Sequence, residues 1–170
     1  KQHEQFSGKK LQFFDPELNQ SYVPYVVETS VGLDRMFLSV LSSAYQEETL
    51  ADGSERVVLK IPAVLAPYKA AILPLIKKDG LPEKAREIMA QLQLEYSVQY
   101  DEKDSIGKRY RRQDAIGTPF SITVDHQTLE DNTVTIRDRD TMIQDRISIV
   151  ELENVIANKA SWKSVLLGLR

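Results

Sequence analysis

Arg35 stands where a helix is expected to begin, a setting that suits a phosphate group. From Leu33 onwards the apolar residues recur at alternating steps of three and one, which predicts a helix with one buried stripe. Arg35 lies in its first turn, where free backbone N–H groups and the positive end of the helix dipole favour anions. Gly32, just before the helix, allows a ligand to approach the backbone closely.

Two polar residues precede this arginine at a spacing that places them together. Glu28 and Ser30 are two positions apart, so in an extended segment their side chains point to the same side. Such a pair can bind a small polar ligand. A purely structural alternative pairs Glu28 with Arg35 and lets Ser30 cap the helix. Taken alone, the residues favour the structural alternative.

A second cluster could bind a polyanion. Residues 108–112 read Lys-Arg-Tyr-Arg-Arg, which places four cations and an aromatic ring in succession. The net charge of −3 gives no indication of nucleic acid, but charges are screened over about 10 Å, so a local patch can act independently. On a helix, Lys108, Arg111 and Arg112 lie on the same side, because they are three and four positions apart. Arg109 points in a different direction around the helix axis. A solvated helix face is the alternative that these residues alone favour.

The composition excludes several classes of chemistry. The chain has 170 residues, no cysteine and only two histidines, which rules out disulfides, thiolate zinc sites and cysteine nucleophiles. We also expect no metal site. The most apolar stretch, residues 61–76, is interrupted by prolines and a lysine, so no membrane span is expected. The N-terminus lacks the apolar core of a signal peptide and does not begin with Met, which suggests a cytoplasmic protein and a fragment of a longer chain.

The first part of the chain has few elements of its own. Residues 1–20 read as loop, and residues 22–27 as a strand that Pro24 confines to a strand start or a sheet edge. The helix over residues 33–45 follows. Residues 46–56 are acidic and polar and read as a linker with a turn at Asp52-Gly53. Residues 1–50 cannot bury the helix stripe themselves, so we expect them to dock on the second part, on a missing domain or on another subunit.

The second part contains enough alternating elements for a domain. We expect strands over residues 68–76, 96–100, 120–124, 132–137 and 142–149, and helices over residues 82–94, 105–116 and 150–162. This order predicts an α/β fold, a mixed and mostly five-stranded sheet with helices on both faces. The expected organisation is a first segment 1–50, a linker 51–60 and a domain 61–170.

Two stretches in this order resemble the glycyl-specific family of class II aminoacyl-tRNA synthetases. The run from Val27 to Arg35 reads Val-Glu-Thr-Ser-Val-Gly-Leu-Asp-Arg and is similar to the third class II signature motif of that family. The stretches 66–82, 105–120 and 131–142 resemble its C-terminal anticodon-binding domain. The resemblance covers nearly the whole chain and implies that residues 1–50 are a strand–helix remnant of the antiparallel catalytic domain.

The resemblance also implies roles for individual residues. Arg35 would be catalytic, contacting the γ-phosphate of ATP, while Glu28 and Ser30 would bind glycine. The ATP-binding set would be Glu28, Gly32 and Arg35. Thr29 departs from the proline that the family often has between the two polar positions. The tRNA-binding candidates are Lys108, Arg109, Arg111, Arg112, Arg137 and Arg139. For Arg137 and Arg139, a structural role beside acidic neighbours is slightly favoured.

The implied activity is that of a glycine–tRNA ligase, which charges tRNA(Gly) with glycine through glycyl-adenylate. ATP with Mg²⁺ would be a substrate of the full-length enzyme, and this fragment alone would hold no cofactor and be inactive. The implied partners are tRNA(Gly), glycine and ATP, with a homodimer for the full-length enzyme and no membrane. The alternative is a stand-alone anticodon-domain-like accessory protein that binds tRNA without charging it.

Overall fold

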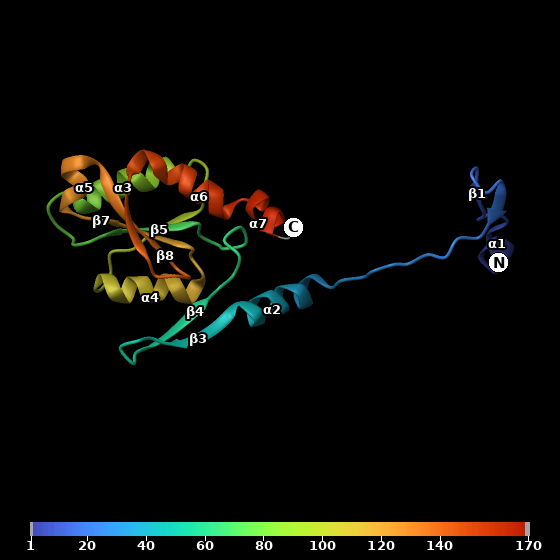
Figure 1. The fold of residues 1–170 in the computed structure, drawn as a ribbon, viewed down its shortest axis with the longest axis horizontal. Coiled ribbons are helices and arrows are strands. Elements are labelled where there is room, and N and C mark those ends of the chain that lie inside the picture. The colour runs from blue at the N-terminus through green and yellow to red at the C-terminus, as the bar shows by residue number, and fades with distance from the viewer. Residues whose placement is uncertain (1, 169–170) are drawn as a thin grey trace. The chain divides into compact units, whose positions relative to one another are not determined.

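The structure is a computed structural model that describes residues 2–168 (Figure 1). The chain divides into two compact units, residues 1–36 and residues 37–170, and each is described by itself. The division falls inside a helix rather than in the expected linker 51–60. Among the described residues, no helix has both the length and the apolar character needed to cross a membrane.

The first unit holds a short helix and a small hairpin. Helix α1 (Gln2–Ser7) is followed by β1 (Phe13–Asp15) and β2 (Gln20–Tyr22), which pair antiparallel. Asp15 Oδ1 accepts hydrogen bonds from the backbone N–H groups of Glu17 and Leu18, which forms the turn. The rings of Phe13 and Tyr22 meet edge to face with centroids 6.0 Å apart.

The strand expected over residues 22–27 is not formed. Strand β2 ends at Tyr22, and residues 23–32 have neither helix nor strand structure. Within residues 2–168, no strand pairs with this segment. Pro24 has no N–H to donate, and a short β-rich run without a neighbouring strand cannot satisfy its backbone groups in a ladder.

Helix α2 (Leu33–Ala44) confirms the helix predicted from the spacing of apolar residues. Its C-terminal half is anchored, because Val40 and Ala44 pack against Ile61, Ala66 and Leu59. Other members of the apolar stripe are exposed, including Phe37, which is 65% exposed. The expectation that this stripe docks on a further surface stays a prediction.

A β-hairpin replaces the expected linker. Strands β3 (Tyr45–Thr49) and β4 (Glu55–Leu59) pair antiparallel, and the predicted turn at Asp52-Gly53 connects them. Gly53 has a φ of 78°, which glycine adopts without strain. Arg56 and Val58 are buried, whereas Val57 between them is exposed. The hairpin therefore has an inner face, which the acidic composition of the segment concealed.

The larger unit is built on a five-stranded mixed sheet with the order β6-β5-β7-β8-β9. Its strands are β5 (Ala70–Pro74), β6 (Val98–Tyr100), β7 (Phe120–Val124), β8 (Thr133–Asp138) and β9 (Gln144–Ser148). Strand β5 runs parallel to β6 and β7, and β8 is antiparallel to β7 and β9. This confirms the predicted fold class.

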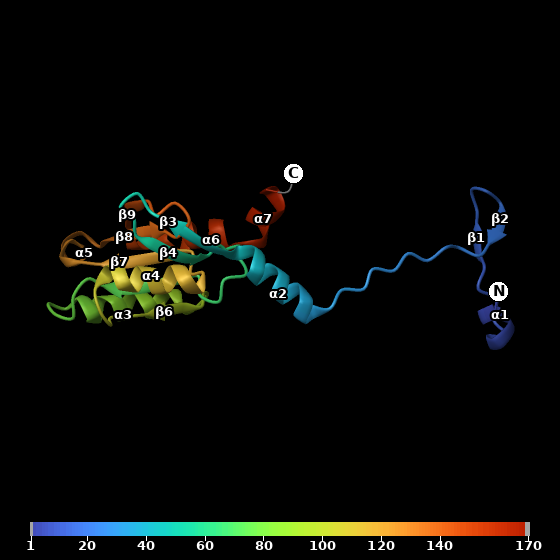
Figure 2. The same ribbon diagram turned by 90° about the horizontal axis from the view of Figure 1, so that it is seen from below.

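Helices cover both faces of the sheet. Helices α3 (Leu81–Leu92) and α6 (Leu152–Ala160) lie on one face and α4 (Ile106–Ile116) on the other (Figure 1). In the turned view, α4 lies in front of the strands (Figure 2). The short helix α5 (His126–Asp131) was not predicted, and the expected closing helix is divided into a 3₁₀ turn (Ile149–Glu151), α6 and α7 (Trp162–Gly168).

The two faces of the sheet differ in chemistry. Residues of β7 and β8 alternate, so Phe120, Ile122, Val124, Val134 and Ile136 all join the apolar core with α3 and α6. The intervening positions Ser121, Thr123 and Arg137 are polar and also buried. Because these positions point to the opposite face, α4 packs on a buried polar surface, and this face positions the candidate site.

Candidate functional site

Helix α4 is seated tightly against the hairpin at its C-terminal end. Ser105 occupies the N-cap position, and Gly117 ends the helix with a φ of 82°. A Cβ atom added at Gly117 would lie 2.7 Å from Ile61 Cγ2 and 3.0 Å from the carbonyl oxygen of Leu59. Glycine adopts this backbone conformation without strain, and it has no Cβ to collide with Leu59 and Ile61 at the end of β4. Position 117 therefore requires glycine.

The outer side of α4 carries three of the six cations expected to bind tRNA. Lys108 is exposed, and Arg111 and Arg112 are partly exposed. Arg112 donates to Asp101 Oδ2 from Nε and NH2, at 3.1 and 2.8 Å, and to Asp104 Oδ2 at 2.9 Å. Its hydrogen bond to Asp101 is the main cause that raises the pKa of Arg112. The Arg112 side chain is still 41% exposed.

Arg109, expected among the tRNA-binding residues, points inward instead. Its NH1 donates to the carbonyl oxygens of Pro74, at 2.6 Å, and Asp101, and its NH2 donates to that of Leu75. The residue is 3% exposed, and this burial lowers the pKa of the guanidinium. Arg109 therefore ties α4 to the carboxyl end of β5 and to the loop after β6.

Arg137 belongs to a buried ionic cluster. Its NH1 and NH2 donate to Asp114 Oδ1 and Oδ2 at 2.7 and 3.0 Å, and its guanidinium lies 4.9 Å from the ring centroid of Tyr110. Arg56 of the hairpin donates to Asp114 Oδ2 at 3.3 Å from the other side. The side chains of Arg56, Asp114 and Arg137 are 0, 1 and 6% exposed. The cluster joins β4, α4 and β8.

Arg139 is likewise an internal residue. Its NH1 donates to the carbonyl oxygens of Ile61 and Gly117 at 2.9 and 2.8 Å, and its Nε and NH2 donate to Asp140. It is 3% exposed. For Arg137 and Arg139, this geometry favours the structural role that their acidic neighbours suggested. The structure therefore brings Lys108, Arg111 and Arg112 together on one surface and uses Arg109, Arg137 and Arg139 beneath it.

The upstream candidates lie in the smaller unit. Ser30 Oγ donates to Glu28 Oε1 at 2.9 Å, so these two residues are together, as their spacing suggests. The carbonyl oxygen of Gly32 accepts a hydrogen bond from the N–H of Met36 at the start of α2. Carbon atoms of the Arg35 side chain lie 3.9 Å from the position of a Cβ at Gly32. The segment thus places Arg35 beside Gly32 at the helix start.

Sequence reasoning did not identify Arg56, Ser54 and Asp114 as part of the site. Arg56 and Ser54 lay in the presumed linker, and Asp114 was considered only as a partner that could tie strands together. The signal for the first two was the Asp52-Gly53 pair, a dipeptide typical of tight hairpin turns. A hairpin beside α4 places its inward side chains against that helix.

The solved RNA-binding domain of threonyl-tRNA synthetase from Cryptosporidium parvum Iowa II has the same kind of fold. It superposes with a TM-score of 0.54 and 22% identity over 59% of this chain and 25% of that chain. The class of protein is therefore that of an α/β domain with the fold of a synthetase RNA-binding domain.

The sequence comparisons define the family. The pattern of the family described as "Anticodon binding domain" matches residues 69–159, and the chain belongs to this family. The glycine–tRNA ligase of Chlorobaculum tepidum is 52% identical over 93% of this chain and 33% of its own length. That of Clostridium tetani is 54% identical over 95% of this chain and 35% of its own length. The chain spans about a third of the length of these curated relatives.

Proposed function

We propose that this chain is the C-terminal part of a glycine–tRNA ligase and that its larger unit binds the anticodon arm of tRNA(Gly). The observation that carries the proposal is the extent of the similarity. The family match covers residues 69–159, while identity above 50% to glycine–tRNA ligases continues over more than nine-tenths of the chain. This extent favours the ligase over an accessory protein that only binds tRNA.

The outer side of α4 is the proposed contact surface. Lys108, Arg111 and Arg112 lie three and four positions apart on one side of the helix, and all three are at least partly exposed. Anticodon loops are single-stranded, and proteins hold them through phosphate contacts and by stacking bases on arginine or aromatic planes. Arg109, Arg137 and Arg139 support this surface from below rather than touching the RNA.

The upstream segment has a separate proposed role in the full-length enzyme. Arg35 would contact the γ-phosphate of ATP, with Gly32 beside it and with Glu28 and Ser30 on the glycine. Glu28, Ser30 and Gly32 precede helix α2 and Arg35 lies in its first turn, and this grouping, with Ser30 bonded to Glu28, supports the assignment. ATP, accompanied by Mg²⁺, is a substrate of this reaction. The full-length enzyme would be a cytoplasmic homodimer, and the chain of 170 residues alone would form no glycyl-adenylate.

RNA binding by the complete chain tests the first part. An anticodon stem-loop RNA of tRNA(Gly) should bind, and the affinity should fall as KCl rises from about 50 to 200 mM. The variants Lys108→Ala and Arg111→Ala should each reduce the log–log salt slope by about 0.7, the value for one phosphate contact on a single strand. Asp145→Asn on β9 is a control. An affinity and slope unchanged in both variants would remove α4 as the RNA surface.

Adenylate formation tests the second part. In a full-length enzyme, Arg35→Ala should reduce ATP–pyrophosphate exchange by orders of magnitude, because charge neutralisation on the phosphates is the main protein contribution to such a step. Exchange near the wild-type rate would remove Arg35 from catalysis. Glycyl-adenylate made by the 170-residue chain alone would refute its proposed inactivity.

A further inference from the structure

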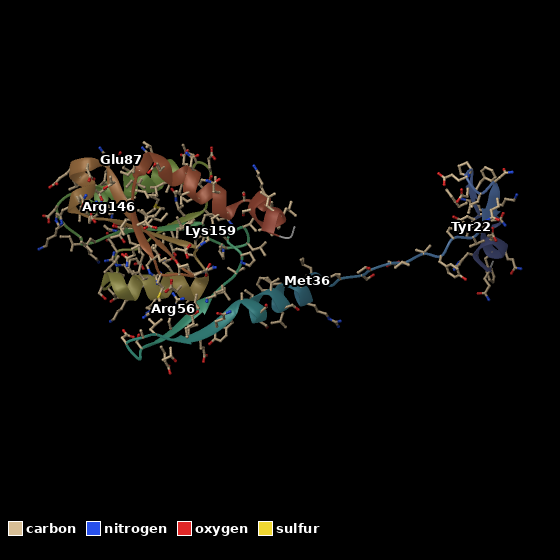
Figure 3. All side chains as sticks on the ribbon, viewed as in Figure 1. Tyr22, Met36, Arg56, Glu87, Arg146 and Lys159 are labelled. Atoms are coloured by element: carbon tan, nitrogen blue, oxygen red, sulfur yellow. The ribbon has the colours of Figure 1, made fainter. Side chains whose placement is uncertain are left out.

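Arg56 fastens the β3–β4 hairpin to the domain. Its side chain extends from β4 toward α4 (Figure 3). Its NH1 donates to Asp114 Oδ2 on α4 and, at 2.9 Å, to the carbonyl oxygen of Arg139 after β8. Its Nε and NH2 both donate to Glu48 Oε2 on β3, at 2.9 and 2.6 Å. The bonds from NH1 therefore hold the hairpin against α4 and the end of β8, while the bonds to Glu48 tie β4 to β3 within the hairpin.

The turn of the same hairpin meets an exposed cation of α4. Ser54, two residues before Arg56, accepts a hydrogen bond from Arg111 NH2 at 3.5 Å. Ser54 is itself fixed, because its Oγ and N–H both donate to Asp52 Oδ1, at 2.7 and 2.9 Å. These bonds are the main causes that lower the pKa of Asp52, and the charge of Arg111 contributes as well. The turn therefore presents an ordered acceptor and a nearby carboxylate to Arg111.

We infer that Arg56 is a positioning residue for RNA binding, acting through Ser54 and Arg111. A free arginine side chain must lose rotamer freedom when it binds a ligand, and an arginine already held in place loses less. The bond to Ser54 holds Arg111 on the outer side of α4, and Arg56 holds Ser54 there. This inference rests on the proposed RNA contact by Arg111.

A set of variants in the complete chain tests the inference with the tRNA(Gly) anticodon stem-loop RNA as probe. Arg111→Ala should weaken binding by about tenfold, as expected for a lost charge-assisted bond. Ser54→Ala and Arg56→Met should each weaken it by about fivefold, the cost of ordering one released side chain. Combining either of them with Arg111→Ala should bring no further loss, because both act through the same residue. Arg56→Lys should restore part of the affinity.

The control is Arg146→Met, which removes the same charge from a different, partly exposed pair, Arg146 with Asp125 on the β9 side. It should leave RNA affinity unchanged to within about twofold at about 0.15 M salt, where charges more than about 8 Å apart are largely screened. Ser54 lies in the turn, so Ser54→Ala decides the question if Arg56→Met does not fold. Wild-type affinity in Ser54→Ala, or losses that add to that of Arg111→Ala, would overturn the inference. No effect of Arg111→Ala would instead refute the contact on which it rests.

Discussion

Asp114 receives both terminal nitrogens of Arg137, at 2.7 and 3.0 Å, in a place that water does not reach. Arg56 adds a second guanidinium to the same carboxylate, and Glu48 provides the charge that balances Arg56. In a bidentate pair of this kind, the donors of the guanidinium and the acceptors of the carboxylate satisfy each other. The carboxylate of Asp114 therefore joins the β3–β4 hairpin, helix α4 and strand β8 of the sheet.

Removing the charge of Asp114 should destabilise the domain strongly. Asp114→Asn leaves the buried guanidinium of Arg137 without its anion and Arg56 with Glu48 alone, and breaking a buried pair in this way costs about 3–5 kcal/mol in comparable cases. Urea denaturation measures this loss in the free energy of unfolding. Asp145→Asn changes an exposed aspartate on β9 and should alter stability by less than about 0.5 kcal/mol. Equal losses in the two variants would contradict the structural role of the cluster.

Substitution by alanine should change the stability of the domain in opposite directions at Gly107, inside α4, and at Gly117, which ends α4. Gly117→Ala imposes a φ of 82° on alanine and places a methyl group 2.7 Å from Ile61, so we expect a loss of at least about 2 kcal/mol. Gly107 lies inside α4 with no atom within 4 Å of an added Cβ. Gly107→Ala should therefore stabilise the domain by about 0.5–1 kcal/mol. Thermal unfolding of both variants checks the pair.

The ion pair between Asp125 and Arg146 should give a defined pH dependence. The hydrogen bonds from Arg146 hold the pKa of Asp125 below its ordinary value of 3.8. A carboxyl with a lowered pKa in the folded state stabilises the protein above about pH 3.8, and this contribution is lost as the pH falls through the folded-state pKa. Asp125→Asn, which can still cap α5, should lack this part of the acid-induced loss.

Melting temperatures of wild type and Asp125→Asn, followed from neutral pH to about pH 2, measure this difference. The two curves should converge in acid because the wild-type carboxylate becomes protonated. A constant separation at every pH would show that Asp125 contributes nothing through its charge.

Tyr100 should ionise only in strongly alkaline solution. Burial, the hydrogen bond to Glu102 and the charge of Glu102 together raise the pKa of Tyr100 to about 12. The phenolate absorbance that Tyr100→Phe removes should therefore appear well above pH 11. Because the folded-state pKa is raised, the contribution of Tyr100 to stability is complete below about pH 10 and is lost as the pH rises through about 12. Glu102→Gln should lower the pKa of Tyr100, and an unchanged titration would contradict the role of Glu102.

Residue patterns predicted several elements closely. Helix α2, strand β7 and helix α4 begin and end within about one residue of their expected bounds. The hairpin was missed because its inward positions include Arg56, a residue type that usually faces water. Helix α5 was missed because it is short and depends on the reciprocal hydrogen bonds between Asp125 and Thr128 rather than on an apolar stripe.

At the candidate site, prediction from the sequence was limited in a different way. Sequence spacing placed Lys108, Arg111 and Arg112 on one side of a helix and Arg109 off it, as observed. The spacing could not show which of the basic residues are buried in the folded domain. Asp114 is 58 positions from Arg56 and 23 from Arg137, and such distant pairs depend on tertiary packing. The roles of Glu28, Ser30, Gly32 and Arg35 stay predictions for the full-length enzyme.

Helix α2 and strand β3 of the hairpin follow one another with no connecting residue. Ala44 ends the helix and Tyr45 begins β3, while the carbonyl oxygen of Ala44 accepts a hydrogen bond from the N–H of Lys60 at the end of β4. One inserted residue would turn the preceding helical residues by about 100°. Phe37 and Leu41 would then face a different direction from the hairpin. Homologous chains should therefore tolerate substitutions at this junction far better than changes of length.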